Sequence, residues 1–176
     1  GAPMDAVTRV KRDLVIANRI LAMNDVLDAY GHVAMRHPTD PKRYFCARSL
    51  SPAIVEEDDI VEYHLDGTPV GDEKRPLYLE RYIHGGVFEQ RPDIQASLHS
   101  HAEDVLTFSI SKTTKLRAVI HSIGEIGDGV PTWDIRDKFG DTTVSLAAGM
   151  KANFRARVHE NPENLPGKDP KESREK

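Results

Sequence analysis

Cysteine is nearly absent from this chain, since Cys46 stands alone among 176 residues. A single thiol excludes an internal disulfide and any metal site built from several cysteines. Long apolar runs are also missing, and no stretch approaches the roughly 20 residues that a membrane-spanning helix needs. The first residues carry no secretory signal pattern. We therefore expect a cytoplasmic protein without a membrane partner.

A strong excess of charge of either sign is absent as well. The chain has 24 Lys and Arg residues against 28 Asp and Glu residues, which gives a formal net charge of −4. A mildly acidic chain has no overall attraction for nucleic acid or an anionic membrane, and we expect neither as a partner. The hydrophobic share of 39% is enough at this length for one domain with a core, but not for two.

The apolar pattern divides the chain into a folded part and a polar tail. Residues 4–150 alternate between helical and strand patterns, which is typical of an α/β domain. From residue 151 the sequence is rich in Pro, Lys and Glu and almost free of apolar side chains. Burial cannot offset the entropy of ordering such a segment. We expect residues 4–150 to form one domain and residues 151–176 to form a disordered tail.

Four segments within the folded part carry clear secondary-structure signals. Apolar side chains recur at three- and four-residue steps over residues 5–29, which predicts a helix capped by Gly31. The pair Asp66-Gly67 inside an alternating stretch predicts a hairpin turn. Residues 78–90 have a helical pattern despite two glycines, and residues 94–102 are predicted to form a buried strand.

His99 and His101 lie at the end of that predicted strand and are the most specific feature of the sequence. Alternate side chains of a strand project to one face, about 6.5 Å apart. Two imidazoles placed in this way can converge on one cation such as zinc. Glu80, on the preceding helix, is placed to be a third ligand or a base beside the metal. An isolated H-x-H pair is also typical of two histidines that bind nothing.

Three motifs occur in order around this pair: Glu80-Arg81-Tyr82-Ile83-His84, Arg91-Pro92-Asp93 and His99-Ser100-His101. In this order and spacing, the chain resembles the class II aldolase/adducin family. The similarity extends from the first predicted helix to residues 137–142. It implies an α/β fold of the α/β/α type, with a central mixed, largely antiparallel sheet flanked by helices.

The resemblance also implies a set of roles for these residues. His99 and His101 are then metal ligands, and Glu80 is the acid/base residue that also contacts the metal in the resting state. The implied cofactor is a divalent metal, in the first place Zn²⁺, with Mn²⁺ or Fe²⁺ as alternatives. His84 is expected to support the site rather than to bind the metal. The implied partners are a small-molecule substrate and further copies of the chain, by resemblance in a tetramer.

The phosphate-binding loops of the family's sugar-phosphate aldolases are altered in this sequence. In the first loop His32 and Ala34 replace an asparagine and a serine, while Arg36 is kept. In the second, Ser49-Leu50 replaces a Thr-Gly turn, whose glycine lets backbone N–H groups approach a phosphate. In the third, Tyr78-Leu79 replaces a pair of serines. These losses in all three loops indicate a substrate without phosphate.

The remaining pattern is similar to the branch of the family that acts on non-phosphorylated, often aromatic, hydroxy-carboxylates and includes decarboxylases. This similarity predicts a metal-dependent lyase in which the cation stabilises the enolate-like charge left by carbon dioxide. Glu80 would shuttle the replacing proton. Arg36 suits a substrate carboxylate. His32, Ser49 and His121 are expected beside the substrate, although each fits a structural role equally well.

Three alternatives stay open at this point. Retro-aldol cleavage of a non-phosphorylated hydroxy-carbonyl compound releases an aldehyde or ketone, and an iron-dependent oxygenase consumes oxygen. The third is a non-catalytic binding module like that of adducin. It is motivated by the family's third metal histidine, which lies in a late strand with no counterpart after residue 142. We therefore expect a domain shortened at its C-terminus, with the third imidazole supplied by His121, by a neighbouring subunit, or missing.

Overall fold

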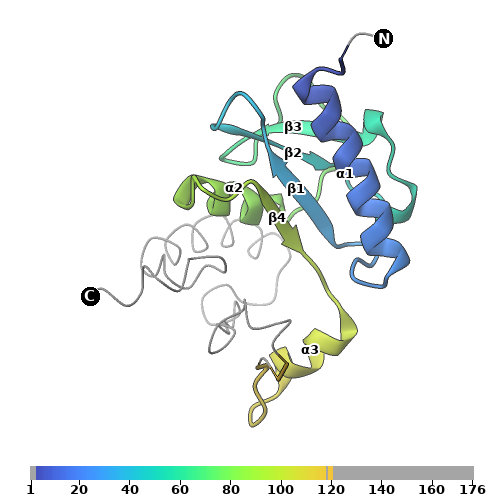
Figure 1. Cartoon of the computed structure of the whole chain (residues 1–176), viewed down its shortest axis with the longest axis vertical. Coiled ribbons are helices and arrows are strands. Elements are labelled where there is room, and N and C mark those ends of the chain that lie inside the picture. Colours follow the sequence, from blue (N-terminus) through green and yellow to red (C-terminus); the bar gives the residue numbers. More distant parts are fainter. Residues whose placement is uncertain (1–2, 118, 121–176) are drawn as a thin grey trace.

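A four-stranded antiparallel sheet forms the centre of the computed structural model, which describes residues 3–117 and 119–120. The strand order is β3-β2-β1-β4. The strands are β1 (His32–Arg36), β2 (Arg43–Ala47), β3 (Ile60–His64) and β4 (Ala96–His99). Helix α1 (Ala6–Met23) lies across one face of the sheet and α2 (Arg81–Gln90) lies on the other (Figure 1). The predicted α/β/α arrangement around a largely antiparallel sheet is confirmed.

The alternation of side chains along the central strands gives the sheet a core on each face. Val33 of β1 and Phe45 of β2 face α1 and join its buried apolar stripe. Ala34 and Tyr44 face the opposite side, where they pack with Phe88 of α2. Full burial of such large side chains stabilises by about 1.5–3 kcal/mol each. Burial therefore holds both helices on the sheet.

Helix α1 is shorter than its apolar periodicity predicts. Asp5 caps its N-terminus by accepting two backbone N–H groups of the first turn. The helix ends at Met23 rather than near residue 29, because Asp25 adopts the left-handed backbone conformation, with φ 56°, and turns the chain away. The predicted cap, Gly31, is therefore not the end of this helix and lies just before β1.

Gly31 allows two strands that carry site residues to approach each other closely. A Cβ atom at this position would lie 2.7 Å from Leu27 Cδ2 and 3.1 Å from the carbonyl oxygen of His99. Residues 32–36 form strand β1. The family's first phosphate-binding loop predicted a loop at these positions. Strand β1 pairs with β4, and His32 stands directly opposite His99. Strand pairing thus brings together two histidines that are far apart in the sequence.

The hairpin turn and the glycine-containing helix are both present. Asp66-Gly67 forms the turn after β3, with Gly67 at φ 85°, and an antiparallel bridge follows it. Helix α2 passes so close to this turn that a Cβ on Gly85 would lie 2.0 Å from the carbonyl oxygen of Leu65. This approach explains a glycine inside a helix, where its propensity is low. It also sets the position of Glu80, the N-cap of α2.

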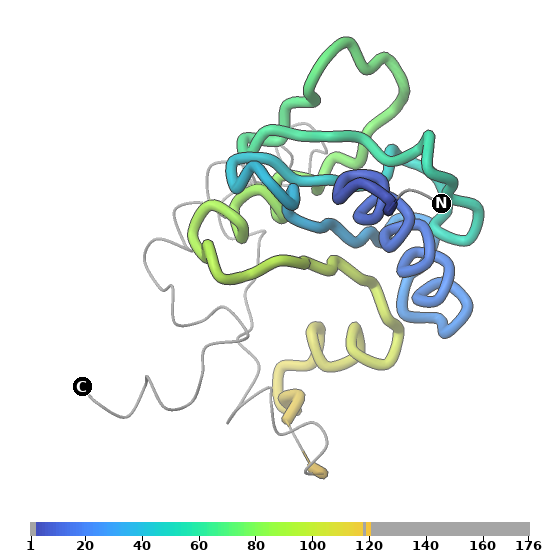
Figure 2. Tube along the Cα trace, turned by 45° about the horizontal axis from the view of Figure 1, so that its top comes forward, coloured from blue at the N-terminus to red at the C-terminus, as the bar shows by residue number. Residues whose placement is uncertain are grey.

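Strand β4 is confirmed, but it is not buried in the described part of the chain, where its side chains alternate between exposed and half-buried. It is one of the two edge strands of the described sheet, and β3 is the other. Helix α3 (Glu103–Ile110) follows β4 and lies away from α1 in both views (Figure 2). None of the helices in the described ranges is long and apolar enough to span a membrane. The predicted tail, residues 151–176, lies outside the described residues.

Candidate metal centre

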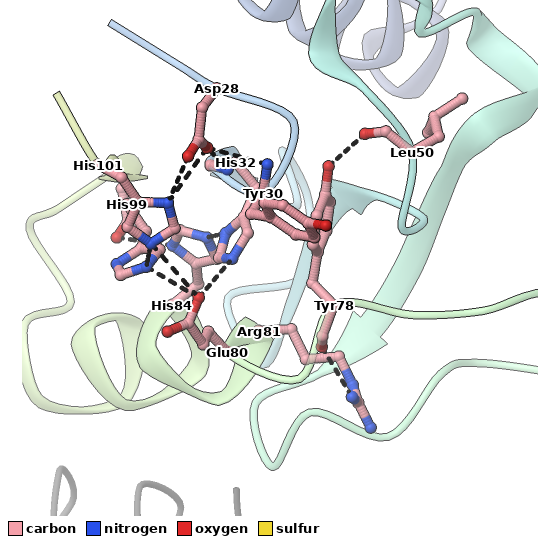
Figure 3. Close-up of polar contacts among 12 residues, drawn as sticks. Asp28, Tyr30, His32, Leu50, Tyr78, Glu80, Arg81, His84, His99 and His101 are labelled. Carbon is pink, nitrogen blue, oxygen red and sulfur yellow. Dashed lines mark hydrogen bonds and ion pairs between the residues drawn. The ribbon is translucent and has the colours of Figure 1, made fainter. Parts of the chain in front are cut away.

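Three histidines and one glutamate converge at one end of the sheet (Figure 3). His99 ends β4, His101 follows it, Glu80 occupies the N-cap position of α2 and His32 is the first residue of β1. The Nε2 atom of His99 lies 2.9 Å from Glu80 Oε2 and 3.0 Å from the Nε2 atom of His101. The Nε2 atoms of His32 and His101 each lie 3.9 Å from the same carboxylate oxygen. The structure thus brings Glu80, His99 and His101 together and adds His32.

This donor set fits a divalent cation of the zinc, manganese or iron(II) type. Imidazole nitrogens and carboxylate oxygens are ligands that these metals accept. One ligand atom each from His32, Glu80 and His99 lies within 4.8 Å of the other two. Two nitrogens bound to one zinc ion at their usual distance in a tetrahedral site stand about 3.3–3.4 Å apart. The Nε2 atoms of His99 and His101, 3.0 Å apart, are slightly closer than that spacing.

One side of the site is accessible and the other is closed. The side chains of Glu80, His99 and His101 are 29%, 21% and 28% exposed, whereas that of His32 is 0% exposed. A small molecule can therefore reach the first three residues from solvent. His32 forms part of the buried wall behind them.

Glu80 is held as a carboxylate. Burial alone would raise its pKa, but the hydrogen bond from His99 and the electrostatic influence of that ring outweigh burial, and the pKa is lowered. An ionised carboxylate in this position can bind a cation or accept a proton from a bound molecule. Both properties are needed for the role that the sequence predicts for Glu80.

Asp28 orients His101 and was not recognised from the sequence. Both of its carboxylate oxygens lie 3.1 Å from His101 Nδ1, and one also accepts the backbone N–H groups of Tyr30 and Gly31. Burial would raise the pKa of Asp28, but the hydrogen bonds from Tyr30 and His101 lower it overall. A carboxylate that accepts the Nδ1 proton leaves the Nε2 lone pair facing the site. This arrangement is typical of histidines that bind metals.

His32 is held from behind by buried neighbours. Its Nδ1 atom lies 2.6 Å from His84 Nε2, and His84 Nδ1 lies 2.9 Å from Ser97 Oγ. The ring of Tyr78 covers another side of His32, at 4.5 Å between ring centroids. Burial lowers the pKa of His32 to about 2 and that of His84 to about 3, with the neighbouring imidazoles adding to the effect. Both rings are therefore neutral at neutral pH.

A second group of donor atoms, from His32, His84 and Cys46, lies deeper in the domain. Burial raises the pKa of the Cys46 thiol to about 12, so the thiol stays protonated. Metals bind the thiolate rather than the thiol. In addition, the facing nitrogens of His32 and His84 already contact each other. This group fits a cation less well than the one around Glu80.

Arg36 does not face the site, which corrects the expectation that it binds a substrate carboxylate. Its buried guanidinium donates to four backbone carbonyl oxygens, those of Pro41, Phe88, Arg91 and Ile94. It also lies four positions beyond His32 in the same strand, about 13 Å along the chain. Its side chain therefore ties β1 to the segment between α2 and β4.

The two other altered loops contact each other. The Ser49 N–H group donates to the carbonyl of Pro76, 2.9 Å away, and the Tyr78 hydroxyl donates to the carbonyl of Leu50. Burial raises the pKa of Tyr78 to about 12, so this hydroxyl keeps its proton. Ser49 thus lies beside the segment that leads to Glu80. His121 lies outside the described residues.

Known proteins share both the sequence pattern and the fold. Residues 12–161 match the Class II Aldolase and Adducin N-terminal domain. Decarboxylase tropJ from Talaromyces stipitatus is 36% identical over 126 residues, which make up 70% of this chain and 47% of that protein. The chain belongs to the class II aldolase/adducin family. It spans about half the length of this curated relative.

Solved structures agree with this assignment at the level of the fold. An aldolase II superfamily protein from Pseudomonas syringae superposes with a TM-score of 0.61 at 19% identity, over 97% of this chain and 83% of that one. L-fuculose 1-phosphate aldolase from Glaciozyma antarctica PI12 gives 0.55 at 21% identity, over 86% and 62%. At these identities the likeness establishes a shared fold only. The reaction has to be inferred from the residues of the site.

Proposed function

We propose that this chain is a metal-dependent carbon–carbon lyase that decarboxylates a small, non-phosphorylated hydroxy-carboxylate. The observation that carries the proposal is the convergence of Glu80, His99 and His101, with ligand atoms 2.9–3.9 Å apart. The relative named as a decarboxylase supports the reaction type. The partial exposure of these three side chains leaves room for a substrate to approach.

The metal ligands and the acid/base residue have separate roles in the proposed reaction. His99 and His101 would hold a divalent cation, with Glu80 in contact with it in the resting state, and the cation would supply a Lewis acid for the negative charge that develops on a substrate oxygen. When carbon dioxide leaves, the bonding electron pair stays on the substrate carbon, which must take up a proton. Glu80 first takes a proton from the hydroxyl group of the substrate and then delivers it to this carbon. A proton from solvent restores the hydroxyl group.

The altered loops support a substrate without phosphate. Where the aldolases have a pair of serines, the ring of Tyr78 packs on His32, and its hydroxyl is used by the carbonyl of Leu50. Neither the ring nor the hydroxyl group of Tyr78 is therefore available to bind a phosphate. Ser49 stays a proposed neighbour of the substrate, and His121 a proposed neighbour of the substrate or metal.

The metal and the assembly belong to the same proposal. Two imidazoles with one carboxylate suit zinc first, whereas the same set with open positions also suits iron(II), and manganese is a third option. We propose a cytoplasmic homo-oligomer, a tetramer by resemblance to the family. Light scattering coupled to size-exclusion chromatography measures the assembly directly.

Product analysis tests the proposed reaction. Protein loaded with zinc, manganese or iron(II) is incubated with aromatic and aliphatic hydroxy-carboxylates, and carbon dioxide release is measured. We expect release by the wild type and a loss of about 10²–10⁴-fold in Glu80→Gln, which cannot transfer the proton. An aldehyde or ketone product would replace the proposal by retro-aldol cleavage, and oxygen consumption would replace it by an oxygenase. Bound metal without any turnover would favour a binding module.

A further inference from the structure

Glu80 and Arg81 follow each other at the start of α2, and their side chains point in opposite directions (Figure 3). The Glu80 carboxylate faces the histidines, with Oε2 2.9 Å from His99 Nε2. It makes no hydrogen bond to the first turn of the helix, although Glu80 occupies the N-cap position. A side chain at this position commonly accepts from the N–H groups of the first turn and so fixes the start of the helix. The start of α2 is therefore held by other contacts.

Arg81 supplies these contacts. Its Nε atom donates to the Gly67 carbonyl, 2.7 Å away, and its Nη1 atom donates to the Tyr78 carbonyl, 2.9 Å away. The Nη2 atom donates to the Tyr82 hydroxyl at 2.8 Å, and the guanidinium lies 4.4 Å from the centre of the Tyr82 ring. The Arg81 carbonyl also accepts from the hydroxyl of Tyr44 in β2, at 2.9 Å. One residue thus joins the first turn of α2 to the segment before it, to the hairpin turn and to the sheet.

The Asp66-Gly67 turn packs tightly against the start of α2. A Cβ atom on Gly67 would lie 2.3 Å from Tyr82 Cδ1, so a side chain at this position would displace the ring that Arg81 covers. Gly71 has nearly the same backbone conformation, with φ 84° against 85°, but a Cβ atom there would meet nothing within 4 Å. The turn therefore supports the helix in addition to closing the hairpin.

We propose that Arg81 is a positioning residue for Glu80: its side chain fixes the start of α2 on the Asp66-Gly67 turn, so that the Glu80 carboxylate points at His99 and His101. The guanidinium suits this role because its planar fork donates in several fixed directions at once. The three hydrogen bonds of its side chain all lie outside the metal centre, so it acts on the site through Glu80. The inference rests on the proposed function for the task of Glu80, whereas the contacts of Arg81 stand without it.

Amide hydrogen exchange in metal-free protein tests whether Arg81 fixes the start of α2. The Ile83 N–H group donates to the Glu80 carbonyl, 2.9 Å away, and its exchange reports on the first turn. Lysine cannot reach the three acceptors of the guanidinium at once, so we expect the Ile83 amide to exchange about 10-fold faster in Arg81→Lys. Exchange of this amide at the wild-type rate in Arg81→Lys would overturn the proposal.

Two glycine variants form a matched pair for the turn. Gly67→Ala displaces the ring of Tyr82 and should also speed the exchange of the Ile83 amide, although it lies in another element. Gly71→Ala introduces similar backbone strain without a new contact and should leave this amide unchanged. The same acceleration in both variants would overturn the role of the turn.

Zinc affinity tests whether Arg81 acts through Glu80. Competition with a metal-binding dye measures it in the wild type, in Arg81→Lys, in Glu80→Ala and in the double variant. We expect Arg81→Lys to lower the affinity about 10-fold in the wild-type background. It should have no further effect once Glu80→Ala has removed the carboxylate that it positions. The same loss in both backgrounds would overturn the proposal, because Arg81 would then act on the fold as a whole.

Failure of the proposed function gives a different result. Zinc affinity that Glu80→Ala leaves unchanged, or a wild type that turns over no hydroxy-carboxylate, counts against the proposed function. The exchange of the Ile83 amide is measured without metal or substrate, and it then still decides whether Arg81 holds the start of α2.

Discussion

At the scale of single residues, the imidazoles of the metal centre are oriented by partners behind them. Asp28 accepts from Nδ1 of His101, and His84 contacts Nδ1 of His32. In each case the contact leaves Nε2 directed toward Glu80. The orientation of the rings, and not only the identity of the ligands, therefore determines what the site can bind.

Asp28→Asn tests the orientation of His101. The amide lacks the charge of the carboxylate and holds the Nδ1–H group less firmly, so we expect metal affinity to fall about 10- to 100-fold. Competition with a metal-binding dye measures this affinity. Asp13→Asn, an exposed change on α1, serves as the matched control and should leave it unchanged. Equal affinities for the two variants would contradict the role of Asp28.

Arg36→Lys tests whether that arginine is structural. Lysine cannot reach the four carbonyl oxygens that the guanidinium satisfies, so we expect a loss of about 2–4 kcal/mol in unfolding free energy. Urea denaturation measures it, with the exposed Arg12→Lys as control. Turnover by the folded fraction should stay at the wild-type level. A raised KM with unchanged stability would restore the substrate-binding role.

At the scale of elements, the position of α2 depends on a glycine. Gly85→Ala places a methyl group against the Leu65 carbonyl, with Cβ at 2.0 Å, so the helix must shift. We expect a loss of about 2–3 kcal/mol in unfolding free energy, together with weaker metal binding through the displaced Glu80. In Gly71→Ala the new Cβ meets nothing within 4 Å and only the φ of 84° is unfavourable, which costs about 1–2 kcal/mol. Equal losses in the two variants would contradict the tight packing of α2.

Elements defined by local signals could be predicted from the sequence, whereas elements defined by distant contacts could not. The turn at Asp66-Gly67 follows from its own residues, and the helix 78–90 and the strand with His99 from local periodicity. The family's phosphate-loop pattern predicts a loop at β1, because the pairing of β1 with β4 joins residues 61 to 67 positions apart, which no local signal reveals. The early end of α1 depends on the backbone of Asp25, which an acidic residue does not reveal by itself.

The same distinction applies to the site. Glu80, His99 and His101 were found from their spacing within one stretch of sequence. Asp28 lies 73 residues from His101 and falls within the predicted helix 5–29, and nothing local links it to His101. His32 was expected near the substrate, but its contact with His84, 52 residues away, appears only once β1 and α2 share a face of the sheet.

At the scale of the whole molecule, two neutral histidines make stability depend on pH. Burial lowers the pKa of His32 and His84 from 6.5 to about 2 and about 3. Below pH 6.5 these two histidines take up protons in the unfolded chain but stay neutral in the folded chain. Their contribution to the free energy of unfolding is therefore complete above pH 6.5 and is lost progressively as the pH falls toward 3. Each ring contributes a slope of up to about 1.4 kcal/mol per pH unit.

Urea denaturation of metal-free protein between pH 7 and pH 5 measures this slope before carboxylates titrate. We expect His84→Gln to reduce it by about half, because one of the two buried rings is removed. His64→Gln, at an exposed position, is the matched control and should leave the slope unchanged. A slope that is the same in all three proteins would contradict burial of neutral rings.

Elemental analysis shows whether Glu80, His99 and His101 form a working metal centre in the whole protein. Protein purified without chelator is compared with a His99→Ala/His101→Ala double variant. We expect about one zinc, manganese or iron ion per chain in the wild type and almost none in the double variant. No metal in the wild type after incubation with all three ions, or equal metal in both proteins, would contradict it.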